Sequence, residues 1–210
     1  MKGKETPPRR ILIVKLSAIG DVIQTLPMVE ALKAHFPEAA IDWVVEEDAG
    51  DLIEGHPALN RVIVSRRKSW MNHFRAGGKH RGTIGEIREF IRDLRSTNYD
   101  WVIDNHGILK SGIIVFLSRG RRKIGFRAAR GIADEGNYLF THERYRALNI
   151  ERHAVERYLD LVAQLGVPVG KRLLPWIVDG KIQERVETLL RQSGLTARPL
   201  IAIHPLAKWP

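Results

Sequence analysis

A glycine and an aspartate lie a few residues after an apolar run near the start of the chain. Residues 11–14 read Ile-Leu-Ile-Val, and the sequence KLSAIGDVIQTLP begins immediately afterwards, at residue 15. Backbone N–H groups are free at the start of a helix, and the helix dipole adds positive potential there. Ser17, Gly20 and Asp21 therefore lie where a polar or anionic ligand is expected. Asp21 also has the chemistry of a general base for a sugar hydroxyl.

Asp21 has a purely structural interpretation as well. Asp is a favoured N-cap residue, and Asp21 followed by Gln24 fits a capping box with Gln at the third helical position. The segment lacks both the G-x-G-x-x-G fingerprint and the G-x-x-x-x-G-K-[ST] phosphate loop. A carboxylate here would also repel a pyrophosphate. The spacing alone therefore favours capping over catalysis.

A basic segment with interleaved aromatic residues is the second candidate site. Residues 66–81 read RRKSWMNHFRAGGKHR, and guanidinium groups suit phosphates and carboxylates. We expect Arg66, Arg67 and Lys68 to bind an anionic ligand, with a solvated loop or a nucleic-acid patch as alternatives. A second basic cluster within residues 119–130 would meet anionic lipid headgroups or form a plain solvated surface.

Four further polar residues are candidate site residues. Lys15 ends the first apolar run, where it would contact an anionic ligand or support Asp21. His106 follows the strand predicted at 99–104, and Lys110 comes one helical turn later, so both are expected near Asp21; helix capping is the alternative. His153 begins HAVERY at a helix start, where a lone histidine is more often a satisfied polar residue.

The elements that must position these residues alternate between strands and helices. This alternation predicts an α/β fold with a parallel sheet and helices on both faces. Residues 66–82 break the rhythm, and we expect them to form a surface segment that is partly helical. Apolar runs predict strands at 10–15, 41–45, 61–64, 99–104, 123–126 and 200–203, and helical spacing or stop signals predict helices at 21–36, 48–54, 83–97, 109–118, 151–165 and 181–193.

The amino-acid composition excludes some classes of function and favours others. The chain has 34 basic and 24 acidic residues, a net charge of +10, which favours anionic partners. It has no cysteine, which excludes a disulfide framework and a thiolate nucleophile, and its 8 histidines show no metal-binding spacing. No run approaches the roughly 20 apolar residues that span a bilayer. A Rossmann-type oxidoreductase and a nucleic-acid-binding module remain open, although the missing glycine fingerprint disfavours the oxidoreductase.

Four segments in order along the chain carry a family resemblance. They are KLSAIGDVIQTLP, IDWVVEE (41–47), NYDWVIDNHGILKSG (98–112) and HAVERY (153–158). The chain resembles the N-terminal half of glycosyltransferase family 9. This resemblance implies a GT-B architecture, with a basic tail at 1–9 and a Rossmann-like acceptor-binding domain at 10–178. Residues 179–210 would then be an interdomain helix and the first strand of a truncated C-terminal donor domain.

The resemblance also implies an activity. It is an inverting, metal-independent transfer of heptose from ADP-heptose to a Kdo-lipid A acceptor in lipopolysaccharide inner-core synthesis, without a cofactor. A second heptosyl transfer, or another sugar transfer within the family, is the alternative. The enzyme would be cytoplasmic and peripheral on the anionic inner membrane, with no specific nucleic acid partner. Since the donor site would lie mostly in the missing domain, we expect the 210 residues alone to be inactive.

Roles for individual residues follow from the same resemblance. Asp21 falls on the aspartate that acts as the catalytic base in the family, and this shifts the weight from capping to catalysis. The acceptor would be bound by Lys15, Ser17, Gly20, Arg66, Arg67, Lys68, His106, Lys110 and His153.

Overall fold

The chain divides into two compact units, residues 1–174 and 175–210. The computed structural model describes residues 6–77, 80–129, 133, 135–147, 151–170, 180–195 and 200–201. The first unit holds the sheet, and the second contains helix α6 (Gly180–Gln192). The boundary predicted at residue 178, and residues 202–203 of the last predicted strand, lie outside the described residues.

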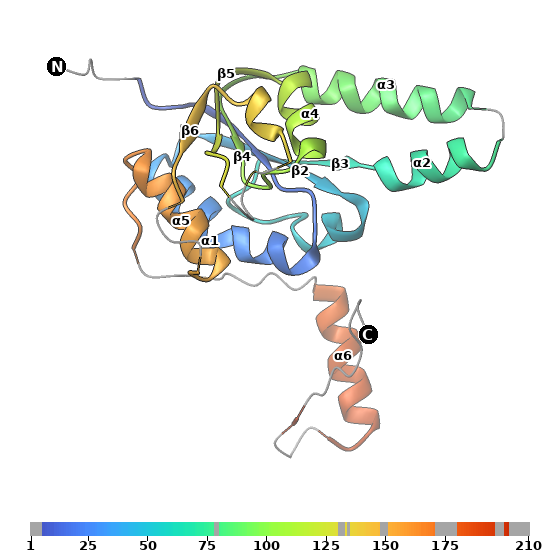
Figure 1. Ribbon diagram of the computed structural model, residues 1–210. Coiled ribbons are helices and arrows are strands. Elements are labelled where there is room, and N and C mark those ends of the chain that lie inside the picture. The colour runs from blue at the N-terminus through green and yellow to red at the C-terminus, as the bar shows by residue number, and fades with distance from the viewer. Residues whose placement is uncertain are drawn as a thin grey trace. The chain divides into compact units, whose positions relative to one another are not determined.

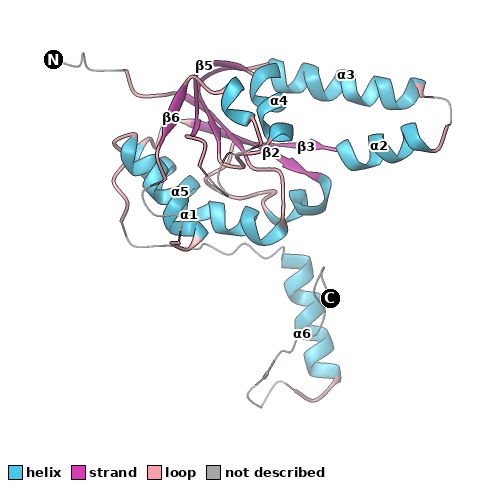
Figure 2. Cartoon of the chain, in the orientation of Figure 1, coloured by secondary structure: helices cyan, strands magenta, loops and turns pink. Residues whose placement is uncertain are grey.

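A six-stranded parallel sheet forms the centre of the first unit, which confirms the predicted fold class (Figure 2). Its order is β3-β2-β1-β4-β5-β6, and every neighbouring pair is parallel. The chain builds outward from β1 in one direction and then returns to build outward from β4 in the other. Ligands in such sheets bind at the carboxyl ends of the strands beside this switch point. The strands are β1 (Arg10–Val14), β2 (Ala40–Glu46), β3 (Arg61–Ser65), β4 (Asn98–Asp104), β5 (Arg119–Phe126) and β6 (Glu143–Tyr145).

Helices cover both faces of the sheet, as Figure 1 shows. Ile11 and Ile13 of β1 face one apolar cluster, and the alternating Leu12 and Val14 face the other. Because both faces of the sheet are buried, the central strand β1 reads as an almost continuous apolar run. One face is covered by α1 (Ile19–His35), α5 (Ala154–Gln164) and the 3-10 helix η1 (Glu47–Leu52); the other is covered by α2 (Arg67–Arg75), α3 (Arg81–Arg95) and α4 (Leu109–Leu117).

The basic segment forms a helical hairpin with the helix that follows it. Figure 1 shows α2 and α3 side by side, reaching out beyond the sheet. Trp70 of α2 meets Phe90 of α3 edge-on, with ring centroids 5.6 Å apart. The partly helical segment expected at 66–82 is thus helical over most of its described length.

Helix α1 begins two residues earlier than predicted. Ala18 is the N-cap, and the N–H of Ala18 donates to Asp21 Oδ2 at 3.3 Å, with Asp21 in the third helical position. The prediction that Asp21 is the N-cap, paired with Gln24, is therefore wrong. Gly20 lies inside the first helical turn rather than in a tight turn. Nothing lies within 4 Å of where a Cβ on Gly20 would be, so its backbone is open.

Strands β5 and β6, at one side of the sheet, were the least predictable elements. The short strand expected at 123–126 extends back to Arg119 as β5. Strand β6 was not predicted, because its three residues, Glu-Arg-Tyr, contain no apolar run. Trp43 of β2 and Trp101 of β4 are buried in the core.

Two helical glycines have opposite surroundings, and they give a paired test of the packing. A Cβ on Gly112 of α4 would lie 2.6 Å from the Phe140 ring and 3.0 Å from Asn137 Cα, whereas one on Gly85 of α3 would meet nothing within 4 Å. Gly112→Ala should therefore lower the free energy of unfolding by about 1–3 kcal/mol. Gly85→Ala should raise it by about 0.5–1 kcal/mol. Urea unfolding followed by tryptophan fluorescence measures both, and changes of the same sign would contradict this packing.

Candidate functional site

Three strand ends meet at one edge of the sheet. Val14 at the end of β1 is level with Val44 of β2 and with Asp104 of β4. Beyond the strands, the N–H of Glu46 donates to the carbonyl of Leu16 at 2.8 Å. The segments that follow β1, β2 and β4 therefore share one surface at the switch point.

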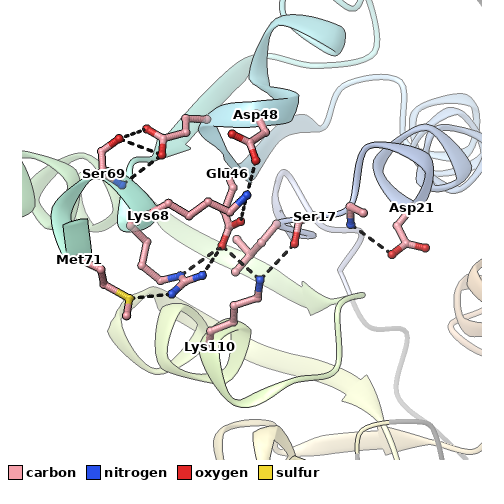
Figure 3. A network of polar contacts seen from close by, with 12 residues as sticks. Ser17, Asp21, Glu46, Asp48, Lys68, Ser69, Met71 and Lys110 are labelled. Atoms are coloured by element: carbon pink, nitrogen blue, oxygen red, sulfur yellow. Dashed lines mark hydrogen bonds and ion pairs between the residues drawn. The ribbon is translucent and has the colours of Figure 1, made fainter. Parts of the chain in front are cut away.

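The carboxylate of Asp21 lies at this edge and is open to solvent. Its side chain is 43% exposed. The N–H of Ala18 donates to Oδ2, and the ammonium of Lys15 lies 3.7 Å from the same oxygen. In Figure 3, Ser17 lies between Asp21 and the charged network around Glu46. Asp21 thus supports the start of α1 with one oxygen while its carboxylate stays accessible, so capping and proton transfer are compatible roles.

Lys15 is turned into the protein beneath Asp21. Its Nζ donates to the hydroxyl of Tyr158 at 3.0 Å, and its own carbonyl accepts from the indole of Trp43 at 3.0 Å. Burial lowers the pKa of the Lys15 ammonium, while Asp21 and Asp104 oppose that shift. Burial, reinforced by the charge of Asp21, raises the pKa of Tyr158 to about 12. Lys15 is therefore placed to support Asp21 rather than to reach a ligand in solution.

The buried carboxylate of Glu46 contacts cationic side chains from two helices, α2 and α4. Its side chain is 1% exposed, and Oε1 accepts from Arg67 Nε and Nη2 at 3.2 and 3.1 Å. The same oxygen accepts from Lys110 Nζ at 3.2 Å, and Lys68 Nζ lies 3.5 Å from Oε2. Burial disfavours the charged form of Glu46, but Lys110 and Arg67 outweigh it, and its pKa is lowered.

The same network extends to both sides of Glu46 (Figure 3). Lys110 Nζ also donates to Ser17 Oγ at 3.1 Å, which joins α4 to the segment before Asp21. On the other side, Lys68 forms an ion pair with Asp48. The carboxylate of Glu47 accepts from the N–H and hydroxyl of Ser69. The start of α2 is thereby fixed to the end of β2 by polar contacts.

His106 is held in one tautomer by the backbone. The N–H of Leu16 donates to its Nδ1 at 3.1 Å, so a neutral ring carries its proton on Nε2. Burial, with the nearby charges of Lys15 and Lys110, lowers the pKa of His106 to about 3. Its backbone N–H donates to the fully buried Asp104, which shapes the turn into α4. His106 is therefore a neutral polar group at this edge.

Two predicted site residues lie apart from this cluster. Arg66 lines a cavity of about 270 Å³ beside β3 and α3, with Trp70 and Glu86 among its other lining residues. His153 is the exposed N-cap of α5, and its Nδ1 accepts from the N–H of Val155 at 3.4 Å. The residues that the strand ends bring together are Lys15, Ser17, Gly20, Asp21, Arg67, Lys68, His106 and Lys110.

Sequence reasoning missed Glu46 and Tyr158. Tyr158 lies 143 residues from its partner Lys15. Glu46 ends a predicted strand, where a carboxylate gives no local signal of its partners. The only sequence signal was their position within the IDWVVEE and HAVERY segments. Within the described ranges, no group of three or more His, Cys, Asp or Glu side chains could hold a metal ion. The described helices are also too short or too polar to cross a membrane.

Comparison with known proteins places the chain in a family. The sequence profile of glycosyltransferase family 9 (heptosyltransferase) matches residues 87–210. The chain belongs to glycosyltransferase family 9. Lipopolysaccharide heptosyltransferase 1 of Pseudomonas aeruginosa is 34% identical over 159 residues, which cover 74% of this chain and 42% of that protein. The Escherichia coli K12 protein of the same name is 35% identical, with 74% and 47% covered.

Solved structures of family 9 proteins have the same fold. The E. coli heptosyltransferase WaaC with ADP-2-deoxy-2-fluoro heptose superposes with a TM-score of 0.68 at 33% identity, covering 79% of this chain and 52% of that one. This chain spans about half the length of the relatives it matches. Family membership leaves no support for the oxidoreductase and nucleic-acid alternatives.

The partly buried His106, whose pKa is lowered by its surroundings, predicts a specific pH dependence of stability. Its pKa is about 3 in the folded protein and ordinarily 6.5, so below pH 6.5 the unfolded chain binds a proton that the folded chain does not. As the pH falls below 6.5, this group alone should lower the free energy of unfolding by up to about 1.4 kcal/mol per pH unit. His106→Asn retains an acceptor for the Leu16 N–H but does not titrate. Urea unfolding between pH 7.5 and 5 should show a shallower fall for the variant, and equal slopes would contradict this environment.

Proposed function

We propose that this chain is the acceptor-binding part of an inverting glycosyltransferase that transfers heptose from ADP-heptose to a Kdo-lipid A acceptor. The observation that carries the proposal is the exposed carboxylate of Asp21 at the switch-point edge, which also carries the cations Arg67, Lys68 and Lys110 around Glu46. Membership of family 9 and the similarity to proteins named lipopolysaccharide heptosyltransferase 1 support it.

In the proposed reaction, Asp21 is the general base. An acceptor hydroxyl attacks the anomeric carbon of the heptose, and its proton passes to the Asp21 carboxylate. The new bond forms between the acceptor oxygen and the anomeric carbon. The bond to the diphosphate breaks on the opposite face, and its electron pair leaves with ADP. The ammonium of Lys15 lies 3.7 Å from Asp21 Oδ2 on the buried side of the carboxylate and holds that carboxylate in position.

The proposed acceptor is anionic, and the cation-rich edge suits it. Kdo carries a carboxylate and lipid A carries phosphates, both of which bind guanidinium and ammonium groups. Arg67, Lys68 and Lys110 are partly exposed and would make these contacts. Arg66 and His153 remain proposed acceptor contacts only for the more distant parts of a large lipid, since they lie apart from this cluster.

The donor would be bound mainly by residues beyond this chain, within a GT-B architecture. Support comes from the E. coli WaaC structure with an ADP-heptose analogue, of which this chain matches about half. We therefore expect these 210 residues to bind acceptor without transferring sugar. The transfer would need neither metal nor cofactor.

A second heptosyl transfer of the same pathway is the alternative function. Lipopolysaccharide heptosyltransferase 2 of Salmonella typhimurium matches 96% of this chain, although at only 26% identity. The higher identity of the heptosyltransferase 1 proteins favours the first transfer.

We further propose that the protein is cytoplasmic and contacts the anionic inner membrane peripherally. The outer face of α4 supports this, because Leu109, Ile113 and Phe116 are exposed at helical spacing and Lys110 is the helix's sole charged residue. A solvated surface helix normally presents polar residues on that face. The ammonium of Lys123 lies 6.0 Å from the centre of the Phe116 ring, a combination that suits the headgroup region.

Asp21→Asn tests the proposed chemistry in the full-length protein that carries this chain. Asn keeps an oxygen for the Ala18 N–H but cannot accept the proton, so kcat for heptosyl transfer to Kdo-lipid A should fall by about 10²–10⁴ while Tm stays unchanged. Asp51→Asn is the matched control, because Asp51 is an exposed carboxylate of η1 with no described contact to the proposed acceptor-binding cations, and it should leave kcat unchanged. Retained activity in Asp21→Asn, or a loss of Tm that parallels the loss of activity, would contradict the role of base.

Co-sedimentation with lipid vesicles tests the membrane surface. Wild type should bind phosphatidylcholine vesicles containing phosphatidylglycerol, and Ile113→Asp should reduce that partitioning at least about fivefold, because the apolar contact is lost. Leu52→Asp is the control, since Leu52 of η1 is similarly exposed but lies outside α4. Equal binding by Ile113→Asp and Leu52→Asp would argue against α4 as the contact surface.

A further inference from the structure

We propose that Glu46 is a positioning residue of the acceptor site, whose buried carboxylate gathers Arg67 and Lys110 into one anion-binding array. The two cations come from different helices, α2 and α4, and bond the same oxygen, Oε1. This proposal rests on the proposed function, because it gives these cations the anionic part of the acceptor as their ligand.

The geometry explains why the cations need Glu46. Arg67 and Lys110 place nitrogens 3.1 and 3.2 Å from one oxygen, so these nitrogens lie no more than about 6 Å apart. Two like charges at that separation repel each other, and more strongly in a partly buried site than in water. The negative charge of Glu46 offsets this repulsion. Without it, the two long side chains would separate, and binding would have to order them again.

The array keeps an exposed side for a ligand. Glu46 is 1% exposed, whereas the side chains of Arg67 and Lys110 are 36% and 26% exposed. The carboxylate thus contacts both cations on their buried side, and part of each cationic side chain remains exposed to solvent. A phosphate or carboxylate on that side would bridge the two groups, because such anions accept several charged hydrogen bonds at once.

The array is also joined to the segment that carries Asp21. Lys110 Nζ bonds Glu46 Oε1 and Ser17 Oγ together, and Ser17 precedes helix α1 (Figure 3). Lys110 therefore fixes the position of a bound anion with respect to Asp21, the proposed base. Glu46 acts through these cations and has no proposed contact with the reacting atoms.

The neighbouring Glu47 distinguishes this role from simple anchoring of α2. Its carboxylate also holds the start of α2, through the N–H and hydroxyl of Ser69 at 3.3 and 2.9 Å. Among the described contacts, Glu47 bonds neither Arg67 nor Lys110. If Glu46 only anchored the helix, the two glutamates would be equivalent in their effect on ligand binding.

The experiment measures binding of Kdo-lipid A, in detergent micelles, to the 210-residue chain by titration calorimetry. Glu46→Gln should raise the Kd at least about tenfold, because a neutral amide cannot hold two cations together. Glu47→Gln should change the Kd by less than about twofold, whatever its effect on Tm. In a Lys110→Met background, Glu46→Gln should have a clearly smaller effect than in wild type, because the pair it organises is already broken.

Each outcome decides for or against Glu46. An unchanged Kd for Glu46→Gln, equal losses for both glutamate variants, or an undiminished effect in the Lys110→Met background would overturn the proposal. If Glu46→Gln does not fold, Glu46→Asp tests the same claim, because it keeps the negative charge but draws the carboxylate back from Arg67 and Lys110. It should weaken binding severalfold, and wild-type affinity would overturn the proposal. Failure of wild type to bind Kdo-lipid A would instead count against the proposed function.

Discussion

The parallel pairing of β1 with β2 on one side and β4 on the other is the constraint on which the site depends. It brings three connecting segments, far apart in sequence, to one edge of the sheet. Backbone contacts continue beyond the strands, since Glu46 bonds the carbonyl of Leu16 and Asn105 bonds that of Val14. The positions of Asp21, Glu46 and His106 are therefore set by the sheet rather than by loop conformation alone.

Buried charge is the second organising feature of this edge. Lys15, Glu46 and Asp104 are each buried, and each contacts polar or charged partners. At Glu46 the cations outweigh burial and lower its pKa, whereas burial dominates at the other two, lowering the pKa of Lys15 and raising that of Asp104. A buried ion pair contributes little net stability, because desolvation offsets most of the attraction. Such pairs do restrict geometry, since each charge must stay with its partners. We interpret them as fixing where Asp21 and the surface cations lie.

The fold could be read from the sequence wherever burial leaves a periodic pattern. The run at 11–14, and that at 41–45 apart from Asp42, are apolar because both faces of the sheet are covered, and α3 shows helical spacing. Strand β6 has no such pattern, since it is three polar or aromatic residues at the sheet edge. The N-cap of α1 was misassigned because Ala18 has no capping side chain, whereas Asp21 has the right chemistry one turn inside the helix.

The candidate site was only partly predictable for a related reason. Asp21, Arg67 and Lys110 have side chains whose chemistry is recognisable in isolation. The contacts of Glu46 with Arg67 and Lys110 span 21 and 64 residues, and no local pattern encodes them. Likewise, Arg66 and Arg67 are neighbours in sequence, yet Arg66 lines the cavity beside α3 while Arg67 bonds Glu46. Adjacent positions diverge because a helix begins between them.

We propose that an anionic acceptor binds at the edge formed by the ends of β1, β2 and β4. Amide chemical shifts of the ¹⁵N-labelled chain, followed during titration with Kdo-lipid A micelles, test this binding site. The largest changes should fall on residues 15–21, 67–69 and 105–110. Changes confined to the opposite end of the strands, around Arg61 and Asp100, or to the cavity beside α3, would contradict it.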